Sequence, residues 1–380
     1  MSQTARKRHP VLFYLSFTIV FLIFLFMILI CQCNWIAYLV LFLSATALCL
    51  IRNTTCWKGF SAVLCWILSI LLTLTVIPFT NTVSFGGGLV VAYRRYVYTP
   101  GCSARDPQTP VKKSADIWED RDGYQVEQFT YDNMDMKLLQ PDNSNGRVIL
   151  QFHGGAYVYP LNTKFENYAI EYSKINGNSD VLTFDYRVAP ENPYPAALED
   201  ALHAYFWLLD NGYQPEDILF VGDSAGGGLA LATTMYLRDH ELPMPKGIIT
   251  LSAWTNLAFN GESVETNKNS DPQFYEGSPL EGDLIDSTYI GDNSAENPYI
   301  SPVYGDFTGF PPMLMQAGGA ERLLSDTTDV AQKAKDDGVD VQETIYSGMF
   351  HEFQIIAPNI RESKQAYREM EQFVSQLYQE

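Results

Sequence analysis

No cysteine occurs after Cys102, and histidine is scarce, with five residues in a chain of 380. The six cysteines lie in or just after the apolar N-terminal third, where such side chains behave as small hydrophobes. The chain beyond Cys102 therefore has neither a disulfide framework nor a thiol nucleophile. Because the cysteines show no metal-ligand spacing, we predict no metal site, and the chemistry inferred below requires no cofactor.

Acidic residues are missing from the start of the chain, and the first of them is Asp106. Residues 1–100 hold seven of the 25 Lys and Arg residues. Subtracting these leaves 18 basic against 44 acidic residues at positions 101–380, a net charge of −26. Such a surface repels the phosphates of nucleic acids, so we exclude nucleic-acid binding. The charge does not indicate the fold, and the oligomeric state is left open.

Uncharged apolar stretches occupy most of the first 84 residues. About 20 apolar residues span the ~30 Å hydrocarbon core of a bilayer, and three such stretches are found, at about 10–30, 35–51 and 60–79. A cleaved signal peptide has a shorter apolar core. We therefore predict a transmembrane helical anchor over residues 1–84, which makes the chain a multi-pass integral membrane protein in contact with membrane lipid.

Basic residues in the short flanks of these stretches set the expected orientation, since Lys and Arg favour the cytoplasmic side. With three spans, Arg6–Arg8 share one side with the loop that contains Arg52 and Lys58. The N-terminus is then cytoplasmic, and the catalytic domain lies on the extracytoplasmic or lumenal side. Two spans instead of three would reverse this orientation.

From about residue 124 the sequence alternates between strand and helix patterns. Two antiparallel strands are predicted first, at 124–131 and 135–141. Apolar runs typical of strands buried on both faces then alternate with amphipathic stretches. The further strands are expected at 147–153, 180–186, 217–222, 246–252, 312–318 and about 341–346, and helices at 164–176, 195–210, 224–239 and about 359–378. This predicts an α/β fold, a mostly parallel sheet with helices on both faces.

Two segments fall outside this alternation. Residues 85–123, with a Gly triplet at 86–88 and the Pro-rich stretch 99–110, read as a linker. The segment between Leu257 and Ser301, about 45 polar and acidic residues, is longer than an ordinary loop. We interpret 257–300 as a cap insertion over a site.

A G-x-S-x-G stretch, Gly222-Asp223-Ser224-Ala225-Gly226, lies between a predicted strand and a predicted helix. This is the context of a nucleophile elbow, a sharp turn that holds a serine in strained geometry. Small residues two positions either side let the chain pass closely, which accounts for Gly222 and Gly226. The alternative is a simple Gly-rich turn, and the context favours the nucleophile Ser224.

A second glycine turn, in FHGGAY at 152–157, follows a predicted buried strand. Acyl transfer needs N–H donors aimed at the developing oxyanion, and backbone groups of such a turn supply them. Gly154 and Gly155, with the N–H of Ala225 beside the serine, form the predicted oxyanion hole. His153 is expected to brace this turn.

A serine hydroxyl needs a base to act as a nucleophile. His351 is the histidine that comes after both the serine and the candidate acids, the chain order of this class of site. We predict His351 as the general base.

These motifs together give a resemblance that covers the chain from about residue 110. It resembles the hormone-sensitive-lipase-like esterase branch of the α/β hydrolases. The resemblance rests on HGGAY at 153–157, DYRVAPENPYPAALED at 185–200, GDSAGG at 222–227, NPYISPVYGDFTGFPPMLMQAGGAE at 297–321 and HEF at 351–353.

The resemblance implies an α/β-hydrolase catalytic domain at 124–380. It also implies a cap built from the N-terminal segment 85–123 and the insertion 257–300. Two positions depart from the family pattern: Ala156 replaces a third glycine after the oxyanion pair, and Glu321 stands where the family has an aspartate.

Two carboxylates compete for the role of the acid that orients His351. Glu321 lies in the loop after a predicted strand, at the edge of the sheet where sites form. Asp326 falls in a predicted helix with Ser325 as N-cap, where an acid in the first turn offsets the helix dipole. We choose Glu321 and keep Asp326 as the alternative acid.

Two further acids have expected structural roles. Asp223, inside the elbow, is expected to hydrogen-bond neighbouring backbone. Asp185 is expected to form an ion pair with Arg187 that braces the loop below the site.

The sequence thus predicts a membrane-anchored serine hydrolase that cleaves small carboxylic esters, with short- to medium-chain acyl or acetyl groups, through a Ser-His-Glu triad. Two alternatives remain: a catalytically silent protein that binds a small ligand on the same fold, and a deacetylase of surface glycans or lipids.

Overall fold

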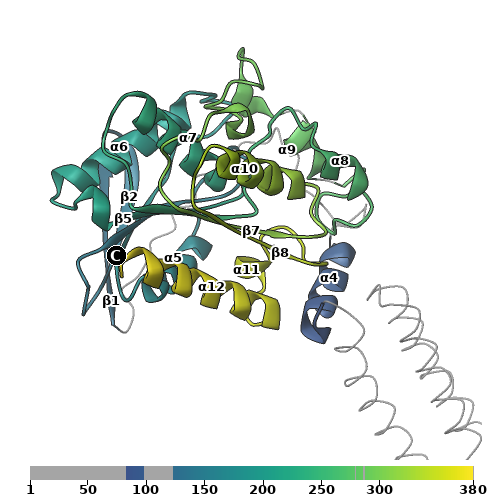
Figure 1. Cartoon of the computed structure of the whole chain (residues 1–380), viewed down its shortest axis with the longest axis horizontal. Helices are drawn as coiled ribbons and strands as arrows, with labels where there is room; N and C mark the ends of the chain where they lie inside the picture. Colours follow the sequence, from purple (N-terminus) through teal and green to yellow (C-terminus); the bar gives the residue numbers. More distant parts are fainter. Residues whose placement is uncertain (1–82, 98–122, 279, 286, 380) are drawn as a thin grey trace, which may run out of the picture. The chain divides into compact units, whose positions relative to one another are not determined.

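The computed structural model describes residues 83–97, 123–278, 280–285 and 287–379. Residue contacts divide the chain into two units, Met1–Tyr93 and Arg94–Glu380. Helix α4 (Phe85–Val97) runs across this division. All the other helices and strands of the described residues belong to the second unit (Figure 1).

The predicted localisation requires a correction. Within the described residues, no helix is both long enough and apolar enough to cross a bilayer. The 13 residues of α4 extend only about 20 Å at 1.5 Å per residue, well short of ~30 Å of hydrocarbon. Assignment as a multi-pass integral membrane protein is therefore withdrawn, and with it the orientation. The stretches predicted as spans, at 10–30, 35–51 and 60–79, lie outside the described residues.

The second unit is built on one sheet of eight strands, in the order β1-β2-β4-β3-β5-β6-β7-β8. The strands are β1 (Tyr124–Tyr131), β2 (Met134–Pro141), β3 (Val148–Phe152), β4 (Asp180–Phe184), β5 (Ile218–Asp223), β6 (Gly247–Leu251), β7 (Met313–Gly318) and β8 (Val341–Tyr346). Strands β3 to β8 pair in parallel, and β2 pairs antiparallel with both β1 and β4. The predicted mostly parallel α/β sheet is confirmed.

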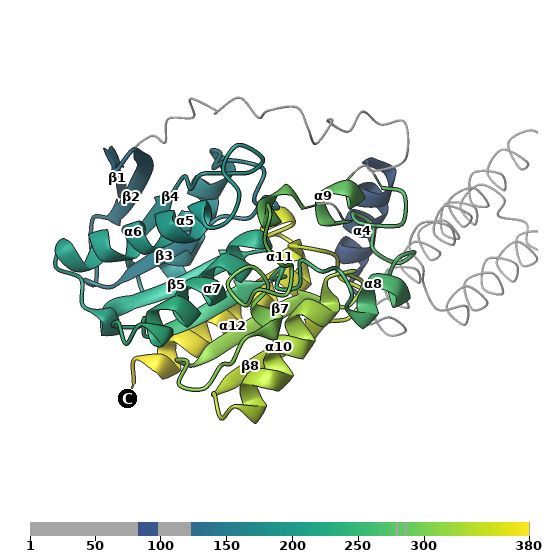
Figure 2. The same ribbon diagram turned by 90° about the horizontal axis from the view of Figure 1, so that it is seen from above.

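Helices cover both faces of the sheet (Figure 1). One face has α6 (Ala196–Asp210), α7 (Ala225–Asp239) and α10 (Leu324–Asp336), which Figure 2 shows from above. The other face has α5 (Lys164–Ile175), the short α11 (Phe353–Ile356) and α12 (Arg361–Leu377). Because they are covered on both sides, β3, β4, β5, β6 and β7 are buried at every position, as their apolar runs require.

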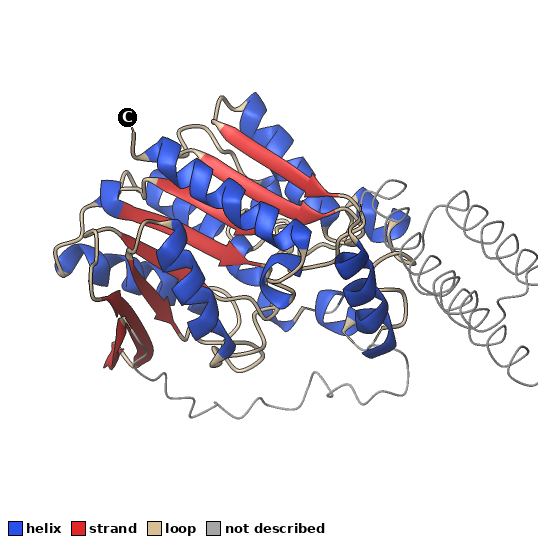
Figure 3. Cartoon of the chain, turned by 90° about the horizontal axis from the view of Figure 1, so that it is seen from below, coloured by secondary structure: helices blue, strands red, loops and turns tan. Residues whose placement is uncertain are grey.

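Strand order reverses beside β3, since the chain adds β4 on one side of it and β5 on the other. Such a switch point leaves a crevice beyond the carboxyl ends of the strands, where α/β proteins form their sites. Figure 3 shows the arrowheads of neighbouring parallel strands at one edge of the sheet. The loops after β3, β5, β6, β7 and β8 therefore meet there.

The described residues of segment 257–300, which was predicted as a cap insertion, form only short helices: α8 (Glu262–Thr266), α9 (Glu281–Ile285) and the 3-10 turn η2 (Thr288–Ile290). Two more 3-10 turns occur elsewhere, η1 (Pro215–Asp217) and η3 (Pro302–Tyr304). Within the insertion, the Tyr289 ring stacks on that of Tyr157, which follows the glycine turn after β3, with centroids 3.8 Å apart. The insertion thus packs on the loops at the carboxyl edge of the sheet.

Candidate active site

Ser224 joins the end of β5 to the start of α7. Its backbone has φ 50° and ψ −121°, a conformation that non-glycine residues rarely adopt. The Ser224 N–H donates to Leu251 O at 2.9 Å, and Ser224 O accepts the Trp254 N–H at 2.8 Å. The loop after β6 thus holds the strained turn in place, as a nucleophile elbow requires.

Gly222 and Gly226 allow the close approach on which this turn depends. A Cβ on Gly222 would lie far inside van der Waals contact of Gly226 O, and one on Gly226 would overlap the carbonyls of Phe152 and His153. Any side chain at either position would push α7 away from β5 and β3.

His351 lies between Ser224 and Glu321. Its Nε2 is 2.9 Å from Ser224 Oγ, and its Nδ1 is 2.9 Å from Glu321 Oε2. Both His351 and Glu321 are buried. These three predicted residues, which lie on the loops after β5, β7 and β8, therefore form one continuous chain of hydrogen bonds.

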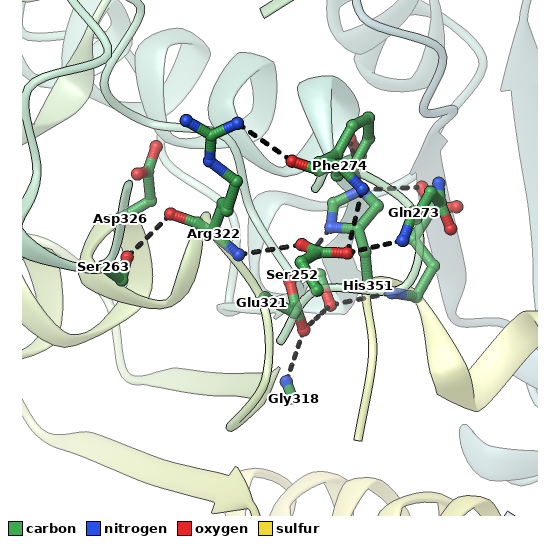
Figure 4. A network of polar contacts seen from close by, with 12 residues as sticks. Ser252, Ser263, Gln273, Phe274, Gly318, Glu321, Arg322, Asp326 and His351 are labelled. Atoms are coloured by element: carbon green, nitrogen blue, oxygen red, sulfur yellow. Dashed lines mark hydrogen bonds and ion pairs between the residues drawn. The ribbon is translucent and has the colours of Figure 1, made fainter. Parts of the chain in front are cut away.

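The second oxygen of Glu321 is held by two further groups. Glu321 Oε1 accepts a bond from the Ser252 hydroxyl at 2.8 Å and a short one from the Gly318 N–H. Figure 4 shows Ser252 and Gly318 on the same side of the Glu321 carboxylate. With both oxygens bonded, Glu321 can orient the His351 ring despite its longer side chain.

Opposing effects act on the His351 imidazole. Burial lowers its pKa, whereas the Glu321 hydrogen bond and the charges of Glu352, Glu321 and Asp271 raise it. The net pKa of His351 is raised above the ordinary value. A raised pKa makes the neutral ring a stronger proton acceptor.

The glycine turn after β3 packs directly against the elbow. The Gly154 N–H donates to Asp223 Oδ2 at 2.9 Å. This amide therefore braces the turn and is not free for an oxyanion, contrary to what the motif suggested for Gly154. In the described part of the chain, the N–H groups of Gly155, Ala156 and Ala225 donate no hydrogen bond.

His153 supports the same turn from below. It is fully buried, its Nδ1 is 2.8 Å from Gly154 O, and its ring stacks on Tyr186 with centroids 4.0 Å apart. Burial lowers the pKa of His153, which keeps the ring neutral. Its position at the base of the turn suits the expected bracing role.

Asp326 lies away from the imidazole, and its surroundings differ from the prediction. Helix α10 begins at Leu324 with Leu323 as N-cap, so Ser325 is not the cap. The buried Asp326 Oδ2 accepts the N–H groups of Thr255 and Asn256, both at 2.7 Å. The Asp326 carboxyl thus faces inward and holds the loop after β6. It does not act as a surface charge at the end of the helix.

The loop after β4 is not braced by the predicted ion pair between Asp185 and Arg187. The Arg187 guanidinium pairs with Asp200 and Glu199, both at 2.9 Å. Asp185 Oδ1 accepts the Leu161 N–H at 3.0 Å. The bracing runs through the start of α6.

Arg322, the residue after Glu321, ties the acid loop to the insertion. Its guanidinium is almost fully buried, pairs with Glu281 at 2.6 Å and donates to Phe274 O at 3.0 Å (Figure 4). Its N–H donates to Asp271 Oδ2 at 2.8 Å. The Phe274 ring in turn packs edge-on to His351, with centroids 5.0 Å apart. The insertion and the imidazole are thus parts of one packed unit.

Known proteins share this fold and parts of this sequence. A family model described as the alpha/beta hydrolase fold matches residues 149–355. An acetyl-hydrolase of Streptomyces hygroscopicus is 34% identical over 236 residues, which cover 60% of this chain and 75% of that protein. A crystal structure of an esterase from the bacterial hormone-sensitive lipase family matches with a TM-score of 0.65 at 31% identity, covering 77% of this chain and 98% of that one.

The chain belongs to the hormone-sensitive-lipase-like branch of the α/β hydrolases. This confirms the resemblance drawn from the motifs, and it makes the chain a hydrolase of ester bonds. An esterase of Acinetobacter venetianus is also similar, at 33% identity over 240 residues that cover 63% of this chain and 78% of that protein.

Two residues of this hydrolase site escaped the sequence analysis. Ser252 ends the predicted strand 246–252, so the rule that placed Glu321 beyond a strand end would have found it. Glu352 belongs to the HEF motif, but the motif assigns it no role of its own. Its left-handed backbone, with φ 55°, has no signature in the sequence.

The close approach at Gly226 yields a first prediction. Gly226→Ala places a methyl group against the Phe152 carbonyl, so we expect kcat/KM on an ester to fall about 10²-fold or more as Ser224 is displaced. Gly282→Ala is the matched control, since Gly282 is exposed and its Cβ would meet no atom within 4 Å. Parent-like activity of Gly226→Ala would show that the elbow tolerates the shift.

Asp326 yields a prediction about stability and pH. Burial raises the pKa of Asp326 to about 8, against the lowering effect of the Thr255 and Asn256 N–H groups, whereas an unfolded aspartate has a pKa of about 3.9. Between these values the folded state binds more protons than the unfolded state. The free energy of unfolding therefore falls as pH rises, by at most about 1.4 kcal/mol per pH unit.

Asp326→Asn removes this titration. Urea unfolding at about pH 5 and about pH 8 should show the variant gaining stability relative to the parent as pH rises. A difference between variant and parent that is the same at both pH values would contradict the assignment.

Proposed function

We propose that this hydrolase cleaves short- to medium-chain acyl or acetyl esters through an acyl-enzyme on Ser224, with His351 as general base and Glu321 as the acid that orients it. The observation that carries the proposal is the continuous chain Ser224 Oγ–His351–Glu321, with both of its links at 2.9 Å.

In the first half-reaction, Ser224 Oγ attacks the ester carbonyl carbon and its proton passes to His351 Nε2. The carbonyl oxygen becomes an oxyanion in a tetrahedral intermediate. As this collapses, the bond to the alcohol breaks, and His351 returns the proton to the leaving oxygen. Glu321 holds the Nδ1–H of the ring throughout, which keeps Nε2 directed at Ser224.

In the second half-reaction, water takes the place of the alcohol. His351 removes a proton from the water, whose oxygen attacks the acyl carbon, and the proton is then returned to Ser224 Oγ. The products are the free acid and the regenerated serine. Apart from water, no step requires a group that the chain does not supply.

The oxyanion is assigned to N–H groups that donate to no acceptor in the described part of the chain, those of Gly155, Ala156 and Ala225. Ala225 is fully buried, and a buried amide is nearly always paired. We assign these three as the donors, and we assign Gly154 to bracing the turn through Asp223. Ala156, at the third-glycine position, thereby keeps its N–H for the substrate.

The preference for small acyl groups is supported by the similar proteins. One is named an acetyl-hydrolase, and a similar crystal structure was soaked with p-nitrophenyl butyrate. That structure has a TM-score of 0.68 at 31% identity, over 78% of this chain and all of the other.

Paired substitutions test the catalytic roles. Ser224→Ala should reduce kcat on p-nitrophenyl acetate by about 10³-fold or more and abolish fluorophosphonate labelling. Glu321→Gln should reduce kcat by orders of magnitude at an unchanged fold, because the ring loses its anionic partner. Asp326→Asn is the control and should keep most of the activity. A large loss in Asp326→Asn with none in Glu321→Gln would reverse the assignment of the acid.

A series of p-nitrophenyl esters tests the substrate class. We expect kcat/KM to be highest for acetate to hexanoate and to fall for dodecanoate and palmitate, since 257–300 packs over the strand ends that carry the serine. Faster hydrolysis of palmitate than of butyrate would be evidence against a short-chain substrate.

A further inference from the structure

Two acids with no part in the proposed mechanism meet beside the site. Asp223 directly precedes Ser224, and Glu352 directly follows His351. Both lie against Gly154, because a Cβ added there would meet the carboxylate oxygens of both. Their positions place a negative charge next to the reacting groups.

The two carboxyl groups lie side by side next to Gly154. Asp223 is buried, and its Oδ2 accepts the Gly154 N–H, while its Oδ1 finds no N–H or hydroxyl donor in the described part of the chain. The Glu352 carboxyl is the charged neighbour of Asp223, since both carboxylates lie against Gly154. Burial and the charge of Glu352 raise the pKa of Asp223 well above its ordinary value. Asp223 therefore favours its protonated form beside the Glu352 carboxylate.

The charge of this pair faces the imidazole. Glu352 Oε1 is 3.8 Å from His351 Nε2, the nitrogen that also contacts Ser224 Oγ. The Glu352 side chain is only 16% exposed, so water screens the interaction weakly.

The backbone of Glu352 is held in an unfavourable conformation to achieve this. Its φ of 55° and ψ of 31° lie in the left-handed region, which glycine adopts without strain. The Glu352 N–H donates to Ser252 Oγ at 3.0 Å, and the same hydroxyl donates to Glu321. One serine thus bonds both the Glu321 carboxylate and the backbone of Glu352. A strained residue that the surroundings hold in place at a site indicates a functional role.

We propose, on the basis of the proposed function, that Glu352 is a positioning residue that acts through His351. Its carboxylate, which lies beside Asp223, stabilises the imidazolium that forms when Ser224 gives up its proton. Glu321 stabilises the same cation from the Nδ1 side, and Glu352 stabilises it from the Nε2 side. The ring therefore works between two acids on opposite edges.

Other ionisable groups around the ring and the pair are accounted for. Asp271 also raises the pKa of His351, but its carboxylate already accepts the N–H groups of Gln273, Phe274 and Arg322. The Arg94 guanidinium bonds to the Gln273 side chain. The remaining groups are tyrosines whose pKa values are raised, chiefly by burial, so that they stay neutral: Tyr168, Tyr172, Tyr186 and Tyr367.

The test is the pKa of His351 in the full chain, followed through its Hε1 resonance by NMR and assigned with the His351→Gln variant. Glu352→Gln removes the carboxylate beside His351 Nε2, and burial continues to favour the protonated form of Asp223. Asp223→Asn combined with Glu352→Gln removes the charge altogether. An opposite charge at this range raises a pKa by about one to three units, so the double variant should lower that of His351 by about one unit or more.

The rate profile should change in the same direction. His351 must be neutral to accept the serine proton, so kcat/KM falls as pH drops through the His351 pKa. The acid limb of the double variant should therefore lie at lower pH than that of the parent, by the shift that NMR measures. Glu171→Gln removes an exposed carboxylate that pairs with Lys174 on α5, and it should leave the limb in place.

An unchanged His351 pKa in the double variant would overturn the inference. If that variant does not fold, Glu352→Gly answers the same question, because glycine fits the left-handed backbone and removes the carboxyl. The titration needs no turnover. Absence of ester hydrolysis in the parent would therefore count against the proposed function, whereas an unshifted imidazole would count against the role of Glu352.

Discussion

The imidazole of His351 must reach Ser224 Oγ with one nitrogen and Glu321 Oε2 with the other, and the loops around it are arranged to allow this. The three residues follow β5, β7 and β8, which are not all neighbours in the sheet. A ring that bridges them at 2.9 Å on each side leaves little freedom in the positions of these loops. Parallel strands meet this need because their carboxyl ends lie at one edge.

Backbone strain is concentrated where these loops pack most closely around the imidazole. Ala156, Tyr157, Ser224, Ser252 and Glu352 all have positive φ and all lie at the carboxyl edge of the sheet. Each such residue costs on the order of 1–3 kcal/mol and persists only where its surroundings hold it. Here the buried parallel strands supply that support. The strain turns the serine, the glycine turn after β3 and the carboxylates toward one another.

Glutamate in place of aspartate illustrates how the loops adapt. The extra methylene of Glu321 would leave its carboxylate free to rotate, but Ser252 and Gly318 bind the oxygen that His351 does not use. Arg322 then fixes the following turn to the insertion through Glu281 and Phe274. The acid is therefore positioned by β6 and the insertion as well as by its own loop.

The sequence by itself determined the fold class and the order of its elements. Apolar runs flanked by turn residues specify strands and helices locally, and all eight strands lie where these patterns predicted. It also determined Ser224 and His351 as candidates, since the G-x-S-x-G turn and the chain order of the histidine are one-dimensional features. The family resemblance came from the same motifs.

Only the tertiary structure decided which acid meets the imidazole, which amides of the glycine turn after β3 donate no hydrogen bond in the described part of the chain, and which groups the Asp326 carboxyl binds. Glu321 and Asp326 are five positions apart, and their roles depend on partners about 70 positions away, at Ser252 and Thr255. The Gly154 N–H is likewise taken up by Asp223, 69 positions later. Hydrogen bonds between distant loops depend on how the strands are ordered in space, and a local pattern does not contain that information.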